Sequence, residues 1–330
     1  MTKRAVVATH GHCFDGLASA VIFTRLLRHL DPEVTSFAYR GMGYGPGQSG
    51  VDPKLFEGDE NAILDYRFSL SDKLTWYFDH HVSAFPGDDD RAVFAARAAQ
   101  TPPRFFHDGG YGSCTKLIAD IGRAQFGFEA PELKSLIEWA DMIDRAAFPN
   151  PQMAVERKEP VLRLMTVIEH GGDDTFIAKM VPRFLFQRLE DIARSAEIER
   201  AYAPLAKQQE LYVEQVRQKS QARGPVVFVD LSESPLEVAG KFVTYALYPE
   251  SLYSVVLSRS TSKCKISVGY NPWCGAPRRH NIARICERYG GGGHPVVGAI
   301  STLSADLDKA RTIAAEVAEE LAGPAHEDAG

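Results

Sequence analysis

The chain has 330 residues, 45% of them hydrophobic, and a formal net charge of −6 at pH 7. The length favours two domains, the apolar fraction suffices for two cores, and the weak acidity gives no overall attraction for nucleic acid. Five scattered cysteines without CxxC spacing argue against a zinc ribbon or a disulfide framework. No apolar run has transmembrane length and no signal-peptide core is found, so we expect a cytoplasmic protein.

Three short apolar strands are expected in the first third of the chain. The first covers residues 5–9, runs into the segment 10–16 (HGHCFDG) and is followed by a helix over residues 17–29. The second covers residues 62–64 and stops at Asp65. The third covers residues 76–78 and ends in Asp79-His80-His81. Each strand therefore leads into side chains that can bind a metal.

Strand ends of this kind meet in one crevice when the sheet is parallel. Carboxylate oxygens together with imidazole nitrogens suit Mn²⁺, Fe²⁺, Co²⁺ or Zn²⁺. Several carboxylates in one place repel each other, and two divalent ions bridged by one carboxylate would relieve that repulsion. Such an ion pair stabilises the attacking and leaving oxygens of a phosphoryl displacement. The pattern therefore predicts a two-metal site for phosphoryl transfer.

The second half of the chain predicts a connector and another domain. Residues 173–221 have a helical pattern with many charges, and Gly224-Pro225 ends it. A strand is expected from Val226, a hairpin over 253–257 and 263–269, and a helix over 277–289. The fold class is α/β, with a parallel-sheet N-terminal domain (1–172), a helical connector (173–223), a smaller α/β C-terminal domain (224–322) and a tail (323–330).

Four glycines at 290–293 precede His294 and read as a loop. Glycine backbone can approach a phosphate or a base closely because no Cβ intervenes. Arg278, at the expected start of the preceding helix, could add a phosphate contact. The alternatives are a flexible turn for the glycines and a solvated surface position for the arginine.

Two motifs together resemble a known family. The Asp79-His80-His81 strand end resembles the DHH phosphoesterase superfamily, and the segment 288–298 (RYGGGGHPVVG) resembles its DHH-associated C-terminal domain. That domain is typical of the branch with nanoRNases, RecJ-like nucleases and cyclic-dinucleotide phosphodiesterases. The two motifs lie in the expected order in different halves of the chain, so the resemblance spans most of it.

The resemblance implies roles for individual residues. Asp65 would bridge the metals, Asp79 would support the neighbouring histidines, and His81 would face the phosphate as the catalytic side chain. The implied metal ligands are His10, Cys13, Asp15, Asp65, His80 and Asp144. The implied substrate-binding residues are Arg278, Gly291, Gly292, Gly293 and His294.

Two of these assignments have competitors. Cys13 stands where family members usually carry an aspartate, and His12 could take that place instead. A thiolate would favour Zn²⁺ over Mn²⁺. Asp141 competes with Asp144, which has Phe148 four positions later as in the family motif. Whether the site holds one metal or two stays open.

The activity that the resemblance implies is metal-dependent phosphoester hydrolysis. We expect a nuclease-like enzyme that cleaves phosphodiester or phosphomonoester bonds of short oligonucleotides, dinucleotides or pAp, with the C-terminal domain holding the substrate. Exopolyphosphatase activity and a non-catalytic, nucleotide-binding family member are the alternatives. Mn²⁺ is the expected cofactor, with Zn²⁺, Co²⁺ or Fe²⁺ as substitutes. No membrane partner is expected, and a homodimer is left open.

Overall fold

The computed structural model describes residues 2–44, 50–234, 240 and 242–324, so most of the expected tail lies outside the described residues. The chain divides into two compact units. The N-terminal unit comprises Met1–Phe148 and Lys158–Tyr202, and the C-terminal unit comprises Pro149–Arg157 and Ala203–Gly330. No helix in the described part is long and apolar enough to cross a bilayer.

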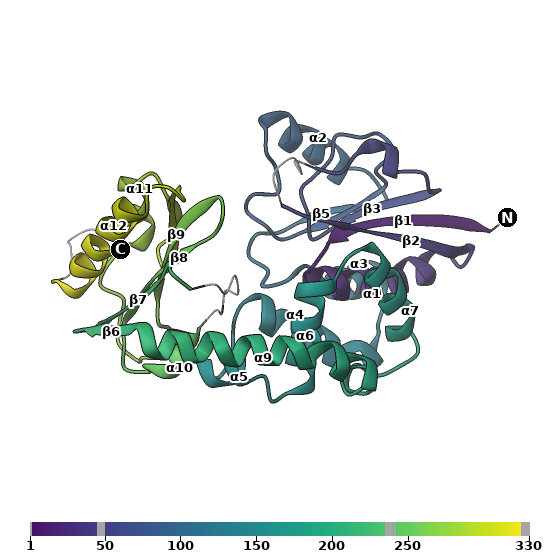
Figure 1. Ribbon diagram of the computed structural model, residues 1–330. Coiled ribbons are helices and arrows are strands. Elements are labelled where there is room, and N and C mark those ends of the chain that lie inside the picture. Colours follow the sequence, from purple (N-terminus) through teal and green to yellow (C-terminus); the bar gives the residue numbers. More distant parts are fainter. Residues whose placement is uncertain (1, 45–49, 235–239, 241, 325–330) are drawn as a thin grey trace. The chain divides into compact units, whose positions relative to one another are not determined.

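A five-stranded parallel sheet forms the centre of the N-terminal unit (Figure 1). Its order is β2-β1-β3-β4-β5, so the three strands with polar ends, β1, β3 and β4, are neighbours. The strands are β1 (Lys3–His10), β2 (Val34–Met42), β3 (Glu60–Leu64), β4 (Trp76–Asp79) and β5 (Phe105–His107). Thr9 pairs with Leu64, and Leu64 pairs with Phe78. The predicted parallel sheet is confirmed, and its register brings the three strand ends together.

Helices cover both faces of this sheet (Figure 1). On one face α1 (Phe14–Leu30) is buried along most of its length and packs against α3 (Cys114–Phe126) and α4 (Lys134–Asp144). On the other face α2 (Asp88–Ala98) covers an aromatic cluster that includes Phe68. The unit also contains η1 (Pro53–Leu55), η2 (Pro131–Leu133), α6 (Pro160–Gly171), α7 (Asp174–Phe184) and α8 (Leu189–Ala193). The first turn of α1 lies against the end of β1, where the Thr9 hydroxyl donates to the carbonyl oxygen of Gly16 at 2.6 Å.

The C-terminal unit is built on a six-stranded mixed sheet of order β10-β11-β9-β8-β7-β6. Its strands are β6 (Ser220–Arg223), β7 (Val226–Leu231), β8 (Tyr253–Arg259), β9 (Lys263–Tyr270), β10 (Gly292–His294) and β11 (Val297–Leu303). Strands β8 and β9 form the expected antiparallel hairpin. The helices of this unit are α5 (Pro151–Glu156), α10 (Val243–Leu247), α11 (Ile282–Arg288) and α12 (Leu307–Ala322).

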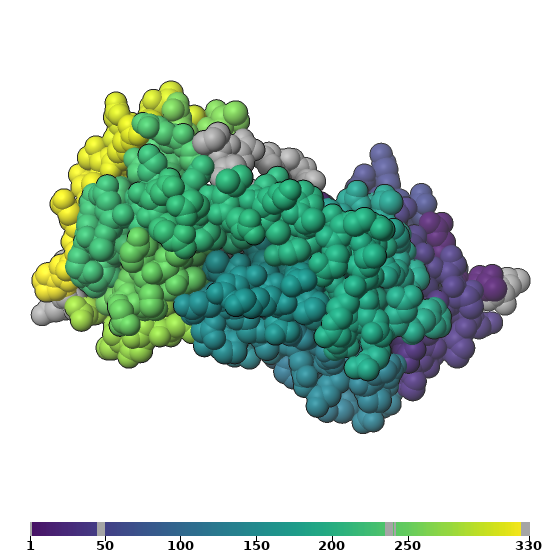
Figure 2. Space-filling view, turned by 60° about the horizontal axis from the view of Figure 1, so that its bottom comes forward, coloured from purple at the N-terminus to yellow at the C-terminus, as the bar shows by residue number. Residues whose placement is uncertain are grey.

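The long helix α9 (Ala196–Lys219) belongs to both units, since the division falls after Tyr202. Most of its side chains are exposed, and Figure 2 shows its outer surface in teal to green. The expected connector, residues 173–223, contains α7, α8, α9 and the edge strand β6. Pro182 and Pro204 suggest that this stretch is divided into several helices, and it does contain α7, α8 and α9. Both prolines, however, lie inside helices, Pro182 in α7 and Pro204 in α9, and not between them.

Two local predictions in the C-terminal unit were wrong. The glycine segment is not an open loop, because Gly292–His294 forms the edge strand β10 paired with β11. A Cβ on Gly291 would collide with the carbonyl oxygen of Ala299, so the glycine permits close approach of two backbones. Helix α11 begins at Ile282 with an Asn281 cap, so Arg278 precedes the helix instead of opening it.

Candidate metal centre

The side chains predicted at the strand ends converge. His10 ends β1, Asp65 follows β3, and His80 and His81 follow β4. Three groups of possible ligand atoms, each within 4.8 Å, form among the described residues. They are His10 with Cys13 and Asp65, Asp65 with His80 and His81, and Asp15 with His80 and Asp144. Asp65 and His80 each belong to two groups, so the three groups form one connected cluster.

Asp65 lies at the middle of this cluster in an unusual conformation. Its φ is +56°, in the left-handed region that non-glycine residues rarely adopt. The side chain is 1% exposed, and neither carboxylate oxygen has a hydrogen-bond partner among the described residues. His10 Nδ1 lies 3.5 Å from Oδ2, and His80 Nε2 lies 3.4 Å from Oδ1. A strained residue with orphaned buried oxygens is typical of a functional site.

The ring of His80 is oriented by a backbone carbonyl group on the side away from the cluster. Its Nδ1 lies 3.1 Å from the carbonyl oxygen of Tyr111, which can accept the proton of that nitrogen. The opposite nitrogen, Nε2, is buried without a hydrogen bond in the described structure and lies 3.3 Å from Asp144 Oδ2. Metal-bound histidines are usually held in this way, with a carbonyl or carboxylate on the second nitrogen. Residue identities alone do not indicate the Tyr111 contact, because it uses a backbone atom.

Asp15 belongs to the cluster and also accepts hydrogen bonds that connect two helices. It lies in the first turn of α1, is 1% exposed and accepts two backbone N–H groups at the start of α3. The nitrogen of Cys114 is 2.7 Å from Oδ2, and the nitrogen of Thr115 is 3.0 Å from Oδ1. Ser113 caps the same helix by accepting from the nitrogen of Lys116. Asp15 therefore joins α1 to α3 and remains 3.8 Å from His80 Nε2.

The electrostatics of the cluster favour a cation. Burial, followed by the negative charges of Asp65 and Asp144, raises the pKa of Asp15 well above its usual value. Burial and the charge of Asp65 raise the pKa of Asp144 to about 6. Burial and the same carboxylates also raise the pKa of the Cys13 thiol. These groups resist losing their protons until positive charge compensates them, and the nitrogen, oxygen and sulfur donors with orphaned Asp65 and His80 atoms fit divalent metal ions.

Asp79 supports His81. Asp79 is fully buried, its Oδ1 accepts from His81 Nδ1 at 2.8 Å, and the hydroxyl of Tyr77 donates to its Oδ2 at 3.1 Å. Burial lowers the pKa of His81, but the bond to Asp79 and the charges of Asp65 and Asp79 raise it above its usual value. With Nδ1 held, Nε2 is the His81 nitrogen left for an external ligand.

The geometry separates the competing ligands. Cys13 belongs to a group with His10, whereas the exposed His12 belongs to none found among the described residues. Asp144 belongs to a group with Asp15, whereas Asp141 pairs with Arg145 at 3.4 Å and joins no such group in the described part of the chain.

The proposed substrate-binding residues lie in the C-terminal unit. His294 is exposed on the edge strand β10, and Gly292 and Gly293 belong to the same strand. The guanidinium of Arg278 donates to the carbonyl oxygen of His280 at 2.6 Å and is half-buried. Gly291 directly precedes the strand.

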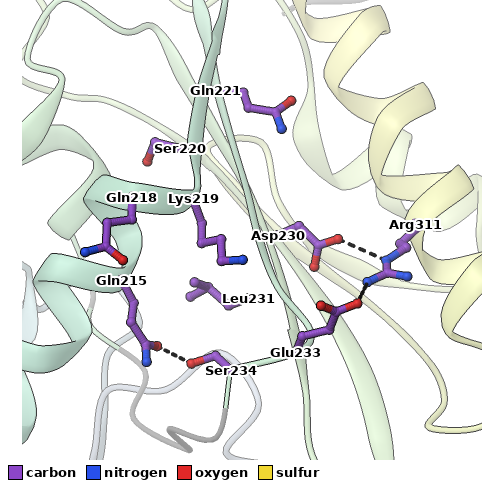
Figure 3. Close-up of a pocket in the computed structure, with 10 residues that line it drawn as sticks. All are labelled: Gln215, Gln218, Lys219, Ser220, Gln221, Asp230, Leu231, Glu233, Ser234 and Arg311. Carbon is purple, nitrogen blue, oxygen red and sulfur yellow. Dashed lines mark hydrogen bonds and ion pairs between the residues drawn. The ribbon is translucent and has the colours of Figure 1, made fainter.

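A separate pocket of about 410 Å³ lies in the C-terminal unit between the end of α9 and β7 (Figure 3). Three of its charged groups pair with one another, because Arg311 lies 3.0 Å from Asp230 and 2.7 Å from Glu233. None of the candidate site residues lines it. The pocket therefore has no part in the metal centre.

Comparisons with known proteins rest on structure alone. No protein-family model and no curated protein matches the chain. The pGpG-specific phosphodiesterase PggH from Vibrio cholerae matches with a TM-score of 0.67 at 17% identity, covering 96% of this chain and 98% of that one. A DHH domain described as belonging to a family of ribosomal proteins matches with a TM-score of 0.56 at 14% identity, covering 98% and 88%.

RecJ from Thermus thermophilus in complex with Mn²⁺ matches with a TM-score of 0.53 at 14% identity. The match covers 98% of this chain and 53% of RecJ. All three likenesses run over both units, including the sheet whose strand ends carry the Asp-His-His motif. The chain therefore has the fold of the DHH phosphoesterase superfamily, to which its two motifs pointed.

Proposed function

We propose that this protein is a divalent-metal-dependent phosphoesterase that hydrolyses short oligonucleotides or dinucleotides. The observation that carries the proposal is the buried Asp65 carboxylate, whose oxygens lack hydrogen-bond partners within the described structure and stand among histidines. Burying such a group without a partner is costly, and a bound cation removes that cost.

Each side chain has a role in this proposal. His10, Cys13 and Asp65 would hold one ion, and Asp15, His80 and Asp144 the other, with Asp65 shared. Divalent ions at such a site lower the pKa of an attacking water and offset charge on the phosphoryl group. The Tyr111 carbonyl fixes the ring of His80, and Asp79 fixes that of His81. His81 Nε2 would contact a phosphoryl oxygen and stabilise its charge.

The substrate class is supported by likeness and by charge. One similar structure is described as a pGpG-specific phosphodiesterase, and the RecJ structure was determined with Mn²⁺. The net charge of −6 does not favour binding of long polyanions. We therefore propose short linear nucleotides as substrates and Mn²⁺ as the metal.

A substrate panel tests the proposed function. Protein stripped by a chelator is assayed before and after addition of Mn²⁺ on linear and cyclic dinucleotides, pAp, longer RNA and DNA, and polyphosphate. We expect Mn²⁺ to restore hydrolysis of short linear nucleotides. Faster turnover of polyphosphate would favour the exopolyphosphatase alternative. Binding of metal and nucleotide without any turnover would favour the non-catalytic alternative.

His294 and Arg278 are expected to act in substrate binding. Replacing either by alanine should raise KM by about tenfold and change kcat less, because a contact made equally in ground and transition states is lost. Steady-state kinetics on a dinucleotide measure this, with Lys309→Ala on α12 as the control for loss of an exposed cation. Loss of bound metal in either variant would contradict the assignment.

Cys13 is expected to bind metal as a thiolate. Metal should then protect it from alkylation, and Cys13→Ala should lower the metal content, whereas His12→Ala, the matched neighbour, should not. Cys13→Asp should shift preference from Zn²⁺ towards Mn²⁺ because oxygen is the harder ligand. Elemental analysis and thiol labelling read out these effects. Equal labelling with and without metal would remove Cys13 from the ligand set.

A further inference from the structure

Arg67 is a cation beside the metal centre that pairs with no anion in the described part of the chain. It stands two positions after Asp65, in the segment that follows β3, and is half-buried. Within the residues that the structure describes, its guanidinium forms no ion pair and no hydrogen bond. Its contact there is with an aromatic ring, since the guanidinium carbon lies 5.0 Å from the centre of the Tyr44 ring.

Tyr44 connects this arginine to the metal centre. Its ring lies 5.0 Å from that of His10 in an edge-on arrangement and 6.3 Å from that of His81. The Tyr66 ring packs 4.7 Å from it, and the Tyr66 hydroxyl donates to the carbonyl oxygen of Gly43. Tyr44 is therefore held at the side of the cluster, and 40% of it is exposed.

Arg67 forms no ion pair with the described carboxylates of the cluster, although it is only two positions from Asp65 in the sequence. An arginine next to several carboxylates ordinarily pairs with one of them, and this one is held on a ring by a cation–π contact instead. The guanidinium fork therefore stays available, and its geometry suits two oxygens of a phosphate.

We infer that Arg67, held on Tyr44, binds a substrate phosphate next to the one that is cleaved. The inference rests on the proposed function, in which the metal ligands and His81 serve the reacting phosphate. Arg67 lies beyond ion-pair distance of every described carboxylate, so it would serve a second phosphate. The preferred substrates then carry at least two phosphates, as a 5′-phosphorylated dinucleotide does.

The test compares pApA, which has two phosphates, with ApA, which has one. Calorimetry in EDTA measures binding alone, because the proposed hydrolysis needs a metal that EDTA removes. Kinetics in Mn²⁺ measure turnover. Wild-type protein should bind pApA more tightly than ApA. Arg67→Ala should weaken binding of pApA by about 10- to 100-fold and leave ApA unchanged, since one charge-assisted contact is lost. Arg67→Lys should retain part of the preference, and Tyr44→Phe should retain all of it.

Arg28→Ala is the matched control. Arg28 is also half-buried and stacks 5.1 Å from the Phe37 ring, in the last turn of α1. Arg28→Ala should change neither the affinity for pApA nor the affinity for ApA. Equal losses for pApA and ApA in Arg67→Ala would place Arg67 at the cleaved phosphate and overturn the inference, as would no loss for either. A wild-type protein that prefers pApA in EDTA but hydrolyses nothing in Mn²⁺ would support this subsite and contradict the proposed function.

Discussion

Replacing Asp65 by asparagine is expected to lower kcat/KM for a dinucleotide by at least about 10³-fold. Asp65 belongs to two of the three ligand groups, so its loss removes charge from both. Asparagine keeps the shape of the side chain, and the native carboxylate makes no hydrogen bond among the described residues that the change would break. The fold should therefore survive, as circular dichroism can show.

Asp141→Asn is the matched control for this substitution. Asp141 lies in α4 near the cluster, but it pairs with Arg145 and joins no ligand group in the described part of the chain. The activity and the metal content of the Asp141→Asn variant should therefore stay close to those of the wild type. Near-normal turnover by Asp65→Asn, or an equal loss in both variants, would contradict the proposed centre.

Asp15→Ala is expected to lower the free energy of unfolding by about 2–4 kcal/mol even without metal. The substitution leaves the backbone N–H groups of Cys114 and Thr115 without their acceptor in a buried position. Asp15→Asn keeps one acceptor oxygen, so its free energy of unfolding should fall less than that of Asp15→Ala. Both variants should also lose metal affinity.

Urea unfolding in EDTA measures this effect, with Asp144→Ala as the comparison. Asp144 lies near the same histidine, His80, but accepts no backbone N–H within the described contacts, so its removal should affect metal binding far more than stability. Equal stability of Asp15→Ala and Asp144→Ala in EDTA would show that the bond from α1 to α3 contributes little.

The central part of the fold could be predicted because the strands β1, β3 and β4 are short apolar runs that end in polar residues. Strand β2 was not predicted, since its side chains are only partly buried and show no clear alternation. Helix α2 was not predicted either, because the acidic run at Asp88 looks like a solvated turn; it opens α2, where Asp90 accepts the backbone N–H of Gly87. Acidic residues favour a helix N-terminus through the helix dipole, and this signal was missed.

The candidate ligands could be named from the sequence, but the choice between neighbours could not be made. Cys13 and His12 are adjacent, and the left-handed φ of +54° at His12 belongs to a turn that only the folded chain reveals. The partners that orient the ligands are largely backbone atoms, such as the carbonyl of Tyr111 behind His80. Backbone contacts between distant segments leave no mark in residue identity, so they could not be predicted.

Crystals of the protein grown with Mn²⁺ give the most direct test of the central claim. An anomalous difference map recorded near the manganese absorption edge locates the ions without reference to activity. The account predicts manganese coordinated by the Asp65 carboxylate, with further ligands from the groups around His10 and His80. Well-occupied Mn²⁺ elsewhere with none at Asp65, or no bound Mn²⁺ at concentrations that support hydrolysis, would contradict it.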